Sequence, residues 1–499
     1  MDIFEWAIAM VQTSPAIAFA LDRQSRVPVY RQLYERTRAA IASGQLPPGG
    51  RLPSARSLAA QLGAARGTVD AAYGLLAGEG WIVGRGPAGT IVSPQLAERL
   101  RVPETTLMAA RGGAPGALPA EAPLLPFRLG LPALDAFPRK LWSRLVAREA
   151  RKLSPAAMAH PDPAGHGKLR EAIAAYLAIA RGIPCAPQQV FVTAGYQGAL
   201  SLIARALIGA GDEVWFEDPG YHLARQGLTA AGARLIPVPV DEEGVRIADG
   251  MACAPQARFV VVTPTHQCPL GVALSLPRRL ALLSWAVKAG AWIIEDDYDG
   301  EFHYRGPPLP ALKSLDQADV VLYAGSFSKV LFPALRMGYL VVPEELVERF
   351  VHACRALHAG NARLDQAVVA RFMADGHFAR HLGRMRALYA ARRAALAGAL
   401  AAAFGDRLRI ELQSGGMHLL ARLPSGTSDT ALVRRAETHG LAPAALSPLS
   451  VEHDCCPGLL IGFTNIAQEH ASDVAGALLD AIGNRLASVR PETLSLWYR

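Results

Sequence analysis

Lysine is rare in this sequence. Only six of the 51 lysine and arginine residues are lysines, in a chain of 499 residues. Arginine therefore serves wherever a positive charge is enough, and a lysine in a small apolar segment is a candidate for chemistry that needs an amine, such as Schiff base formation. Lys329 lies in such a segment, with Ser326 and Ser328 before it and Arg336 after it. The alternative is an ordinary surface lysine on a loop.

Three further absences exclude classes of protein. Every run of about 18 or more mostly apolar residues is interrupted by charged residues, proline or glycine, so no membrane span is expected. The N-terminus carries Asp2 and Glu5 and no basic region, which argues against a secretory signal. The six cysteines are scattered, apart from the adjacent Cys455 and Cys456, and none has the spacing of metal ligands. These absences predict a reduced, cytoplasmic protein without a metal site.

Positive charge is concentrated near the start of the chain. At about 150 residues per domain, the length suggests roughly three domains. Between Arg23 and Val92, nine arginines stand against three acidic residues, which gives this segment +6 of the total formal charge of +8. Such a concentration on a small domain indicates a polyanionic partner such as DNA. The alternative is a solvated arginine-rich face.

The pattern of this basic segment predicts a winged helix-turn-helix. Apolar residues recur every four positions in a first helix over 28–41. A second helix follows Ser54, which is suited to an N-cap, and ends at Gly63. A third helix runs from Arg66 or Thr68 to about Ala77. Short apolar runs at 81–83 and 90–92, separated by glycines, predict a hairpin.

Two motifs fill the second and third helices: Leu52-Pro53-Ser54-x-Arg56-x-Leu58-Ala59-x-x-Leu62-Gly63 and Arg66-x-Thr68-Val69-x-x-Ala72-Tyr73. With Glu79-Gly80-Trp81-Ile82 and Gly89-Thr90, they resemble the DNA-binding domain of GntR-type bacterial regulators. Ala65 departs from the serine usual in that family, so one hydroxyl contact is missing. A winged helix used for protein contacts is the alternative. The resemblance and the chemistry of helix N-termini imply a set of DNA contacts: Arg51, Ser54, Arg56, Arg66, Thr68, Arg85, Gly89 and Thr90.

Composition then divides the chain into three parts. Residues 1–93 form the DNA-binding domain, with its core at 23–92. Residues 94–126 are rich in proline, glycine and alanine, which predicts an exposed, semi-extended linker. Residues 127–499 form a large domain.

The large domain alternates apolar strands with helices. Fully apolar strands with helical crossovers are typical of a buried, mostly parallel sheet, so the expected fold class is α/β, with a smaller α+β part at the C-terminus. Helices are predicted at 197–208 and 277–289. Strands are predicted at 190–193, 213–216, 234–237, 259–263, 291–294, 320–323 and 339–342.

Four groups of residues near strand ends suggest one ligand. Gly195, Tyr196 and Gln197 open a helix whose free N–H groups suit a phosphate. Tyr221 can stack on a flat ring, although a core tyrosine is an equal alternative. Asp296 can hold a pyridine nitrogen protonated, with Tyr298 on a phenolic oxygen. A metal site or a solvated loop is the alternative for this acidic run. Ser326, Ser328 and Arg336 can bind phosphate oxygens beside the Lys329 amine. Together they fit pyridoxal 5′-phosphate.

From about Phe127 to Ile482 the chain resembles fold type I aminotransferases. The resemblance rests on Asp162-Pro163-x-Gly165, Thr263-Pro264-x-His266-Gln267-x-Pro269-x-Gly271, Glu295-Asp296-Asp297-Tyr298 and Ser326-Phe327-Ser328-Lys329. Joined to a GntR-like domain, the whole resembles the MocR/GabR family of bacterial transcriptional regulators. The resemblance implies that Lys329 forms the Schiff base with pyridoxal 5′-phosphate. It also implies a homodimer, head-to-tail, with DNA and a small-molecule effector as partners.

Two departures bear on catalysis. Leucine stands where many aminotransferases place the arginine that binds the substrate carboxylate, in the segment Gly458-Leu459-Leu460-Ile461, and Cys268 replaces a common asparagine. Another arginine, such as Arg225 or Arg363, would then have to bind a carboxylate. The favoured hypothesis is a regulator that senses a small amine, an amino acid or pyridoxal 5′-phosphate itself, with weak transaminase activity at most. The alternative is an aminotransferase with an accessory DNA-binding domain.

Overall fold

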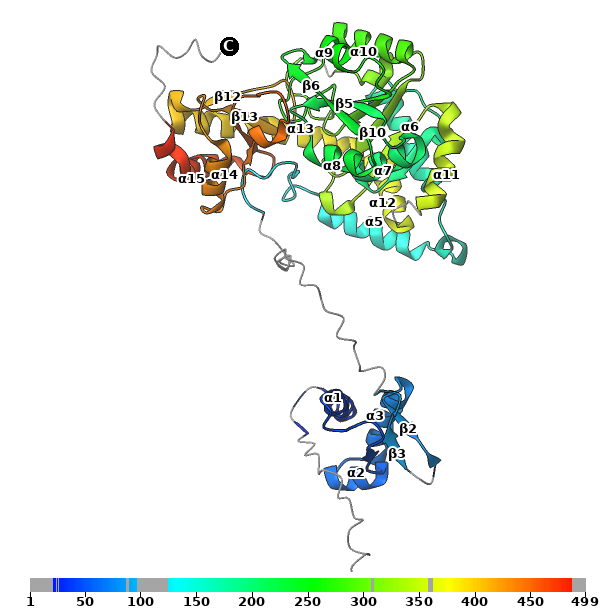
Figure 1. Cartoon of the computed structure of the whole chain (residues 1–499). Helices are drawn as coiled ribbons and strands as arrows, with labels where there is room; N and C mark the ends of the chain where they lie inside the picture. Colours follow the sequence, from blue (N-terminus) through cyan, green and yellow to red (C-terminus); the bar gives the residue numbers. More distant parts are fainter. Residues whose placement is uncertain are drawn as a thin grey trace, which may run out of the picture. The chain divides into compact units, whose positions relative to one another are not determined.

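The computed structural model describes residues 21–23, 25, 27–86, 89–96, 124–306, 309–357 and 362–486. The chain forms two compact units, Met1–Ala120 and Glu121–Arg499, each described here by itself (Figure 1). Most of the linker predicted at 94–126 lies outside the described residues. Within the described parts, every helix is too short or too polar to cross a bilayer.

The first unit is a winged helix-turn-helix. Its strands form one antiparallel sheet in the order β1-β3-β2. Its helices are α1 (Val29–Ala42), α2 (Ala55–Leu62) and α3 (Arg66–Gly78). Its strands are β1 (Arg51–Leu52), β2 (Ile82–Gly84) and β3 (Thr90–Val92).

Local sequence explains where α2 begins and ends. The Ser54 hydroxyl accepts a hydrogen bond from the Ser57 amide, so Ser54 is the predicted N-cap. Gly63 ends the helix with a φ of 58°, a left-handed conformation that glycine adopts without strain. Leu33 of α1, Leu58 of α2 and Val69 of α3 are at most 1% exposed and pack the three helices into one core.

The second unit is built on an eight-stranded sheet in the order β4-β11-β10-β9-β8-β5-β6-β7. Strands β10, β9, β8, β5 and β6 are parallel, whereas β11 is antiparallel to both of its neighbours and β7 to β6. The strands are β4 (Val190–Thr193), β5 (Glu213–Asp218), β6 (Arg234–Asp241), β7 (Gly244–Val245), β8 (Phe259–Val262), β9 (Trp292–Asp297), β10 (Val321–Ser326) and β11 (Gly338–Val341).

Both faces of this sheet are buried, which explains why its strands are continuously apolar. One face packs against α7 (Gly195–Leu207), α8 (His222–Ala230) and α11 (Val347–Leu357). The other packs against two groups of helices. These are α9 (Ile247–Cys253) and α10 (Leu276–Ala289), and α5 (Arg139–Arg151), α6 (Gly167–Ala180), α12 (Arg363–Ala374) and α13 (His377–Phe404).

A smaller α+β part follows the long helix α13. Its antiparallel sheet has the order β12-β13-β15-β14, and α15 packs against α13. The elements are β12 (Arg409–Glu411), β13 (His418–Arg422), α14 (Asp429–Glu437), β14 (Ala444–Ala445), β15 (Gly458–Gly462) and α15 (Ala471–Ile482).

Several strands extend further than the apolar runs predicted. The acidic run was expected to follow its strand, but Glu295, Asp296 and Asp297 are the last three residues of β9. Asp218 likewise ends β5. Judged by hydropathy alone, such carboxylates are assigned to a loop. In the structure the parallel pairing of β9 with β10 continues as far as Asp297, which lies opposite Gly325. Neighbouring acidic residues of β9 therefore point to opposite faces of the sheet.

Candidate functional site

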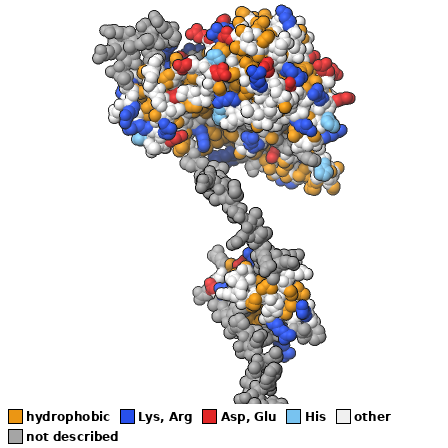
Figure 2. Space-filling model, in the orientation of Figure 1, with side chains coloured by type: hydrophobic (Ala, Val, Ile, Leu, Met, Phe, Trp, Pro, Cys, Tyr) orange, Lys and Arg blue, Asp and Glu red, His pale blue; other side chains and the backbone are white. Residues whose placement is uncertain are grey.

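The first unit presents the residues predicted to contact DNA. Arg51, Arg56 and Arg85 are exposed, and so is Arg66 at the start of α3. Figure 2 shows blue basic side chains grouped on the surface of this unit. The ion pair between Arg66 and Asp70 spans 3.4 Å with both side chains more than half exposed, so its loss on binding DNA would cost little.

Gly89 lies in the turn between the two strands of the wing. Its φ of 91° lies in the left-handed region, which favours glycine. Its carbonyl accepts a hydrogen bond from the Arg85 amide at 2.8 Å. The next residue, Thr90, is half-buried. Thr68 is half-buried in the first turn of α3. Ala65 is the N-cap of α3 and makes no side-chain cap. The Thr68 amide in the first turn of α3 donates instead to the Ala65 carbonyl at 2.9 Å.

In the second unit, Lys329 follows the end of β10. Its Nζ donates to the Gly130 carbonyl at 3.1 Å. Gly130 has a φ of 70°, and a Cβ at this position would lie 2.3 Å from Lys329 Nζ, so glycine is required here. Burial lowers the pKa of Lys329, although the nearby Cys268, Asp299 and Asp296 partly oppose that shift. A lowered pKa makes the amine a better nucleophile at neutral pH.

Asp296 lies in β9, opposite Ala324 of β10 in the register. Burial raises its pKa well above the ordinary value, and the charges of Asp297 and Asp299 raise it further. A cationic partner such as a protonated ring nitrogen would lower the pKa of Asp296 again, and so would offset both its burial and the nearby negative charges.

Buried polar atoms without a partner test whether these residues fit pyridoxal 5′-phosphate. Among the described residues, the hydroxyls of Tyr196 and Tyr298 and the amide nitrogen of Gln197 are buried and unpaired. Burying such groups without a hydrogen bond is costly unless a ligand completes them. Tyr196 and Gln197 lie in the first turn of α7, and Tyr298 directly follows β9. A ligand with a phenolic oxygen and a phosphate supplies hydrogen-bond partners of the kind they lack. The residues therefore fit this cofactor.

The remaining predicted cofactor residues lie close to these. The Tyr221 ring is 6.3 Å from the Tyr196 ring, and burial, followed by the charges of Asp296 and Cys268, raises the pKa of Tyr221 to about 12. Gly195 begins α7 with a φ of 72°. Strand β11 lies close to the start of α7, because a Cβ at Gly338 would lie 3.0 Å from the Gly195 Cα.

Ser326, Ser328 and Arg336 flank the lysine in the sequence. The Ser326 hydroxyl accepts from the Ser328 amide at 3.1 Å. Arg336 has a φ of 48°, a conformation rare for residues other than glycine and often found at ligand sites. Its charge acts on Tyr221, which places the guanidinium near the same site.

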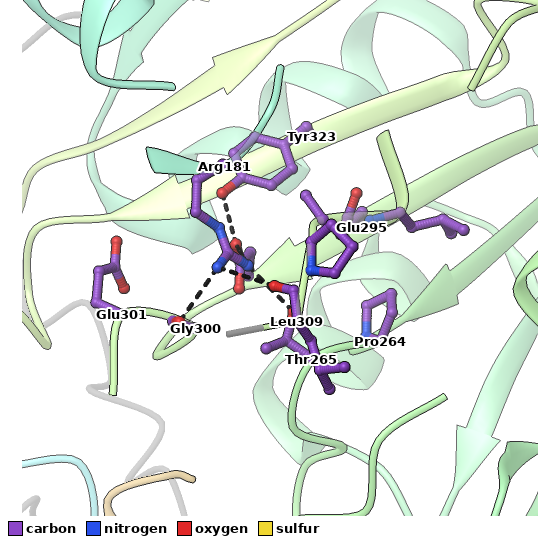
Figure 3. A network of polar contacts seen from close by, with 12 residues as sticks. Arg181, Pro264, Thr265, Glu295, Gly300, Glu301, Leu309 and Tyr323 are labelled. Carbon is purple, nitrogen blue, oxygen red and sulfur yellow. Dashed lines mark hydrogen bonds and ion pairs between the residues drawn. The ribbon is translucent and has the colours of Figure 1, made fainter. Parts of the chain in front are cut away.

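A network of buried polar contacts, which the sequence analysis did not predict, fixes the Asp297 carboxylate at the end of β9 (Figure 3). The Arg181 guanidinium pairs with the Asp297 carboxylate and donates to the Gly300 carbonyl at 3.2 Å. The Tyr323 hydroxyl donates to Asp297 at 2.6 Å. Burial and the charge of Asp297 raise the pKa of Glu301 to about 7. No local sequence signal marks Arg181, since its partner lies in a distant strand.

A second buried pair is formed by His266 and Asp299, to which the sequence analysis assigned no role. His266 Nδ1 lies 2.9 Å from the Asp299 carboxylate, and both side chains are buried. Gly415 leaves room for the imidazole, because a Cβ there would lie 2.0 Å from His266 Nε2.

The two arginines proposed for a carboxylate occupy different places. Arg225 donates to the Leu449 carbonyl at 3.4 Å, so it lies near the loop that follows β14. Arg363 lines a cavity of about 910 Å³ between α5, α6, α12 and α13, and none of the predicted cofactor residues lines that cavity. The suggestion that Arg363 binds an effector carboxylate stays a prediction.

Comparisons with known proteins cover both units. Residues 29–92 match the family of bacterial regulatory proteins of the gntR family, and residues 138–450 match aminotransferase class I and II. The chain is 38% identical to the probable rhizopine catabolism regulatory protein MocR of Rhizobium meliloti, over 89% of this chain and 92% of that protein. It is 33% identical to the pyridoxine biosynthesis transcriptional regulator PdxR of Corynebacterium glutamicum, over 93% and 98%.

A solved structure resembles the second unit. The α-aminoadipate aminotransferase LysN of Thermus thermophilus, complexed with N-(5′-phosphopyridoxyl)-L-leucine, has a TM-score of 0.67 and 29% identity, over 73% of this chain and 93% of that one.

Proposed function

The chain belongs to the MocR/GabR-type regulators, in which a GntR-family DNA-binding domain is joined to an aminotransferase class I and II domain, and on this premise we propose how it works. It is a pyridoxal 5′-phosphate-dependent transcriptional regulator. The winged helix binds operator DNA, and the second unit senses a small amine, an amino acid or pyridoxal 5′-phosphate itself. Like any DNA-binding regulator, it would act in the cytoplasm of a bacterium.

The observation that carries this proposal is the surrounding of Lys329. A buried amine with a lowered pKa lies near Asp296 and the unpaired hydroxyls of Tyr196 and Tyr298, in a chain that also exposes Arg66 at the start of α3. When bound, pyridoxal 5′-phosphate supplies an aldehyde that combines with primary amines and an absorbance that changes with the amine.

Each residue has a part in holding that group. Lys329 would bind the aldehyde carbon and Asp296 would keep the ring nitrogen protonated. Tyr298 would donate to the phenolic oxygen, and Tyr221 would cover the ring. Gly195, Tyr196 and Gln197, with Ser326, Ser328 and Arg336, would bind the phosphate.

An effector can change DNA binding only if it favours one arrangement of the regulator over another. Lys329 would tether the cofactor to the segment that follows β10, and an effector amine that replaced it would remove this tether. The free Lys329 Nζ can donate to the Gly130 carbonyl, as it does at 3.1 Å in this structure. Two-fold operator half-sites call for a dimer, and we propose the head-to-tail homodimer that the family resemblance implies.

Lys329→Ala tests the proposal. The variant should lose the cofactor absorbance and the effector response, and should keep sequence-specific binding to the DNA upstream of its own gene. Lys288→Ala, which removes a lysine from an exposed position near the end of α10, is the control and should keep the absorbance. A Lys329→Ala protein with unchanged absorbance and effector response would refute the role of this amine.

The second candidate is an aminotransferase with an accessory DNA-binding domain, which the likeness to LysN favours. Wild-type turnover of an amino donor at about 1 s⁻¹ or more would support the enzyme. Slower turnover together with an effector-dependent gel shift would support the regulator.

A further inference from the structure

Positive charge on the second unit is concentrated in two helical segments, α5 and the start of α13. Helix α5 contains five cationic side chains and one acidic one, and the first ten residues of α13 contain three cationic side chains and none that is acidic. Residues 23–92 hold +6 of the total formal charge of +8, so all the rest of the chain holds +2. Because the two helical segments together carry +7, the remainder of the chain outside residues 23–92 is net acidic.

The cations of α5 form one stripe along this helix, which lies at the edge of the second unit (Figure 1). Four exposed cations recur every three or four residues and so share one side of the helix: Lys140, Arg144, Arg148 and Arg151. Among the described residues, Lys140, Arg144 and Arg151 have no ion-pair or hydrogen-bond partner. Lys140 and Arg144 lie about 6 Å apart along the helix axis, close to the rise of about 6.8 Å for two nucleotides of a DNA strand.

A hollow joins this stripe to the start of α13. It has a volume of about 650 Å³, and Leu141 lines it from α5, whereas Arg380 and Arg384 line it from α13. Asp375 links the two helices, because its carboxylate lies 3.8 Å from the Arg148 guanidinium and its carbonyl accepts from Arg380 at 3.0 Å. The cations of both helices therefore form one surface, called the basic face here: Lys140, Arg144, Arg148, Arg151, Arg380 and Arg384.

The composition of this surface suits the backbone of duplex nucleic acid. Small side chains are exposed on the same two helices, among them Ser143, Ala147 and Gly383, so a phosphate backbone can approach the cations closely. Within α5 and α13, every residue of which is described, no aromatic side chain is exposed. Trp142, for example, packs edge-on against Phe332 with ring centroids 5.3 Å apart. Single-stranded nucleic acid binds largely by stacking on exposed aromatic rings, which this surface does not offer.

Duplex DNA is also the polyanion that the chain brings within reach. The segment between Leu96 and Leu124 joins the two units and can span at most about 100 Å. DNA held by the first unit is therefore at a high effective concentration for the second. An RNA or an acidic protein would have to bind without this advantage.

Resting on the proposed function, we infer that the basic face is a second DNA-contact surface, which binds phosphates of the DNA that flanks the operator. The winged helix selects the operator sequence. The basic face adds affinity that does not depend on sequence and that falls as salt rises.

The full-length double variant Lys140→Ala/Arg144→Ala tests this inference on the DNA upstream of its own gene, with fluorescence anisotropy at several salt concentrations. Loss of two phosphate contacts should reduce the slope of log affinity against log salt by up to about 1.8 for each protomer whose basic face touches DNA. The loss of affinity should shrink as salt rises. Arg205→Ala/Lys288→Ala removes the same charge from exposed positions of α7 and α10, and its slope should match the wild type.

Shortening the duplex from both ends locates the contact. The difference between the wild type and Lys140→Ala/Arg144→Ala should disappear once the flanking DNA is removed, while specific binding remains. A difference that persists on the shortest specifically bound duplex would overturn the inference, and so would equal losses in both double variants. A basic face that serves an RNA or an acidic protein instead would leave the slope on long DNA at the wild-type value, which would also overturn it. A wild-type protein that does not bind the upstream DNA specifically would refute the proposed function, so the two failures can be told apart.

Discussion

The Arg181 guanidinium lies 2.5 Å from the Asp297 carboxylate, and both side chains are almost fully buried. This pair joins the end of α6 to the strand that carries Asp296. Because successive side chains of a strand point to opposite faces, Asp297 faces Arg181 and Asp296 faces the Lys329 side of the sheet.

Arg181→Met should strongly destabilise the second unit. The substitution leaves the buried Asp297 carboxylate without its cation, which costs about 3–5 kcal/mol in the free energy of unfolding. Arg181→Lys should recover part of that loss, because a single ammonium reaches Asp297 but cannot also serve Gly300 and Thr265. Chemical denaturation measures both variants. Arg205→Met, at an exposed position of α7, should stay within about 0.5 kcal/mol of the wild type.

Arg66→Ala should weaken DNA binding by about 1–3 kcal/mol if the side chain reads a base edge, or reduce the slope of log affinity against log salt by about one if it contacts phosphate. Arg66 is exposed at the start of α3, so the change should not affect folding. Fluorescence anisotropy at several salt concentrations gives both quantities. Lys288→Ala removes the same charge from the exposed surface of the second unit, and an equal effect there would show that Arg66 acts only through net charge.

Ala65→Ser should stabilise the first unit by about 1 kcal/mol, because a serine hydroxyl at the N-cap can accept from an amide in the first turn of α3. The backbone of Ala65 already has the extended conformation that an N-cap needs. Hydrogen exchange in the full-length chain should slow at residues 66–68. Ala64→Ser, one position too early to cap the helix, should give no such protection.

Asp218 fixes the loop after β14, and its loss should loosen that loop. Its carboxylate accepts from the amides of Val451, Glu452 and His453 at 2.8–2.9 Å. Burial acts to raise the pKa of Asp218, but these bonds outweigh it and hold the pKa below its ordinary value. Asp218→Asn should cost about 1–3 kcal/mol and speed hydrogen exchange at 451–453 near pH 7.

The pH dependence of this contact follows from the sign of that shift. A lowered folded-state pKa contributes stability that is fully present above the unfolded-state pKa of about 3.9 and is lost as the pH falls through the folded-state value. Protection of 451–453 in the wild type should therefore persist at pH 5 and decline only in stronger acid. Loss of protection already between pH 7 and pH 5 would show that a group other than Asp218 controls the loop.

Local patterns were sufficient to predict the three helices and the hairpin of the first unit and seven of the eight strands of the large sheet. The strands β4, β5, β8, β10 and β11 fall on the apolar runs, because a strand buried on both faces requires apolar residues throughout. The ends of β5 and β9 were predicted too short, because Asp218 and Asp297 resemble loop residues until their distant partners Val451 and Arg181 are known.

The sequence by itself determined which residue types could do the chemistry: one lysine in an apolar segment, an acidic strand end, glycines that begin a helix, and an arginine-rich first unit. Only the tertiary structure decided their surroundings. The Gly130 carbonyl that binds Lys329 lies 199 residues away along the chain, and the Val451 amide bound by Asp218 lies 233 residues away. Such contacts depend on how the strands are ordered in the sheet, and no local pattern of residues encodes that order.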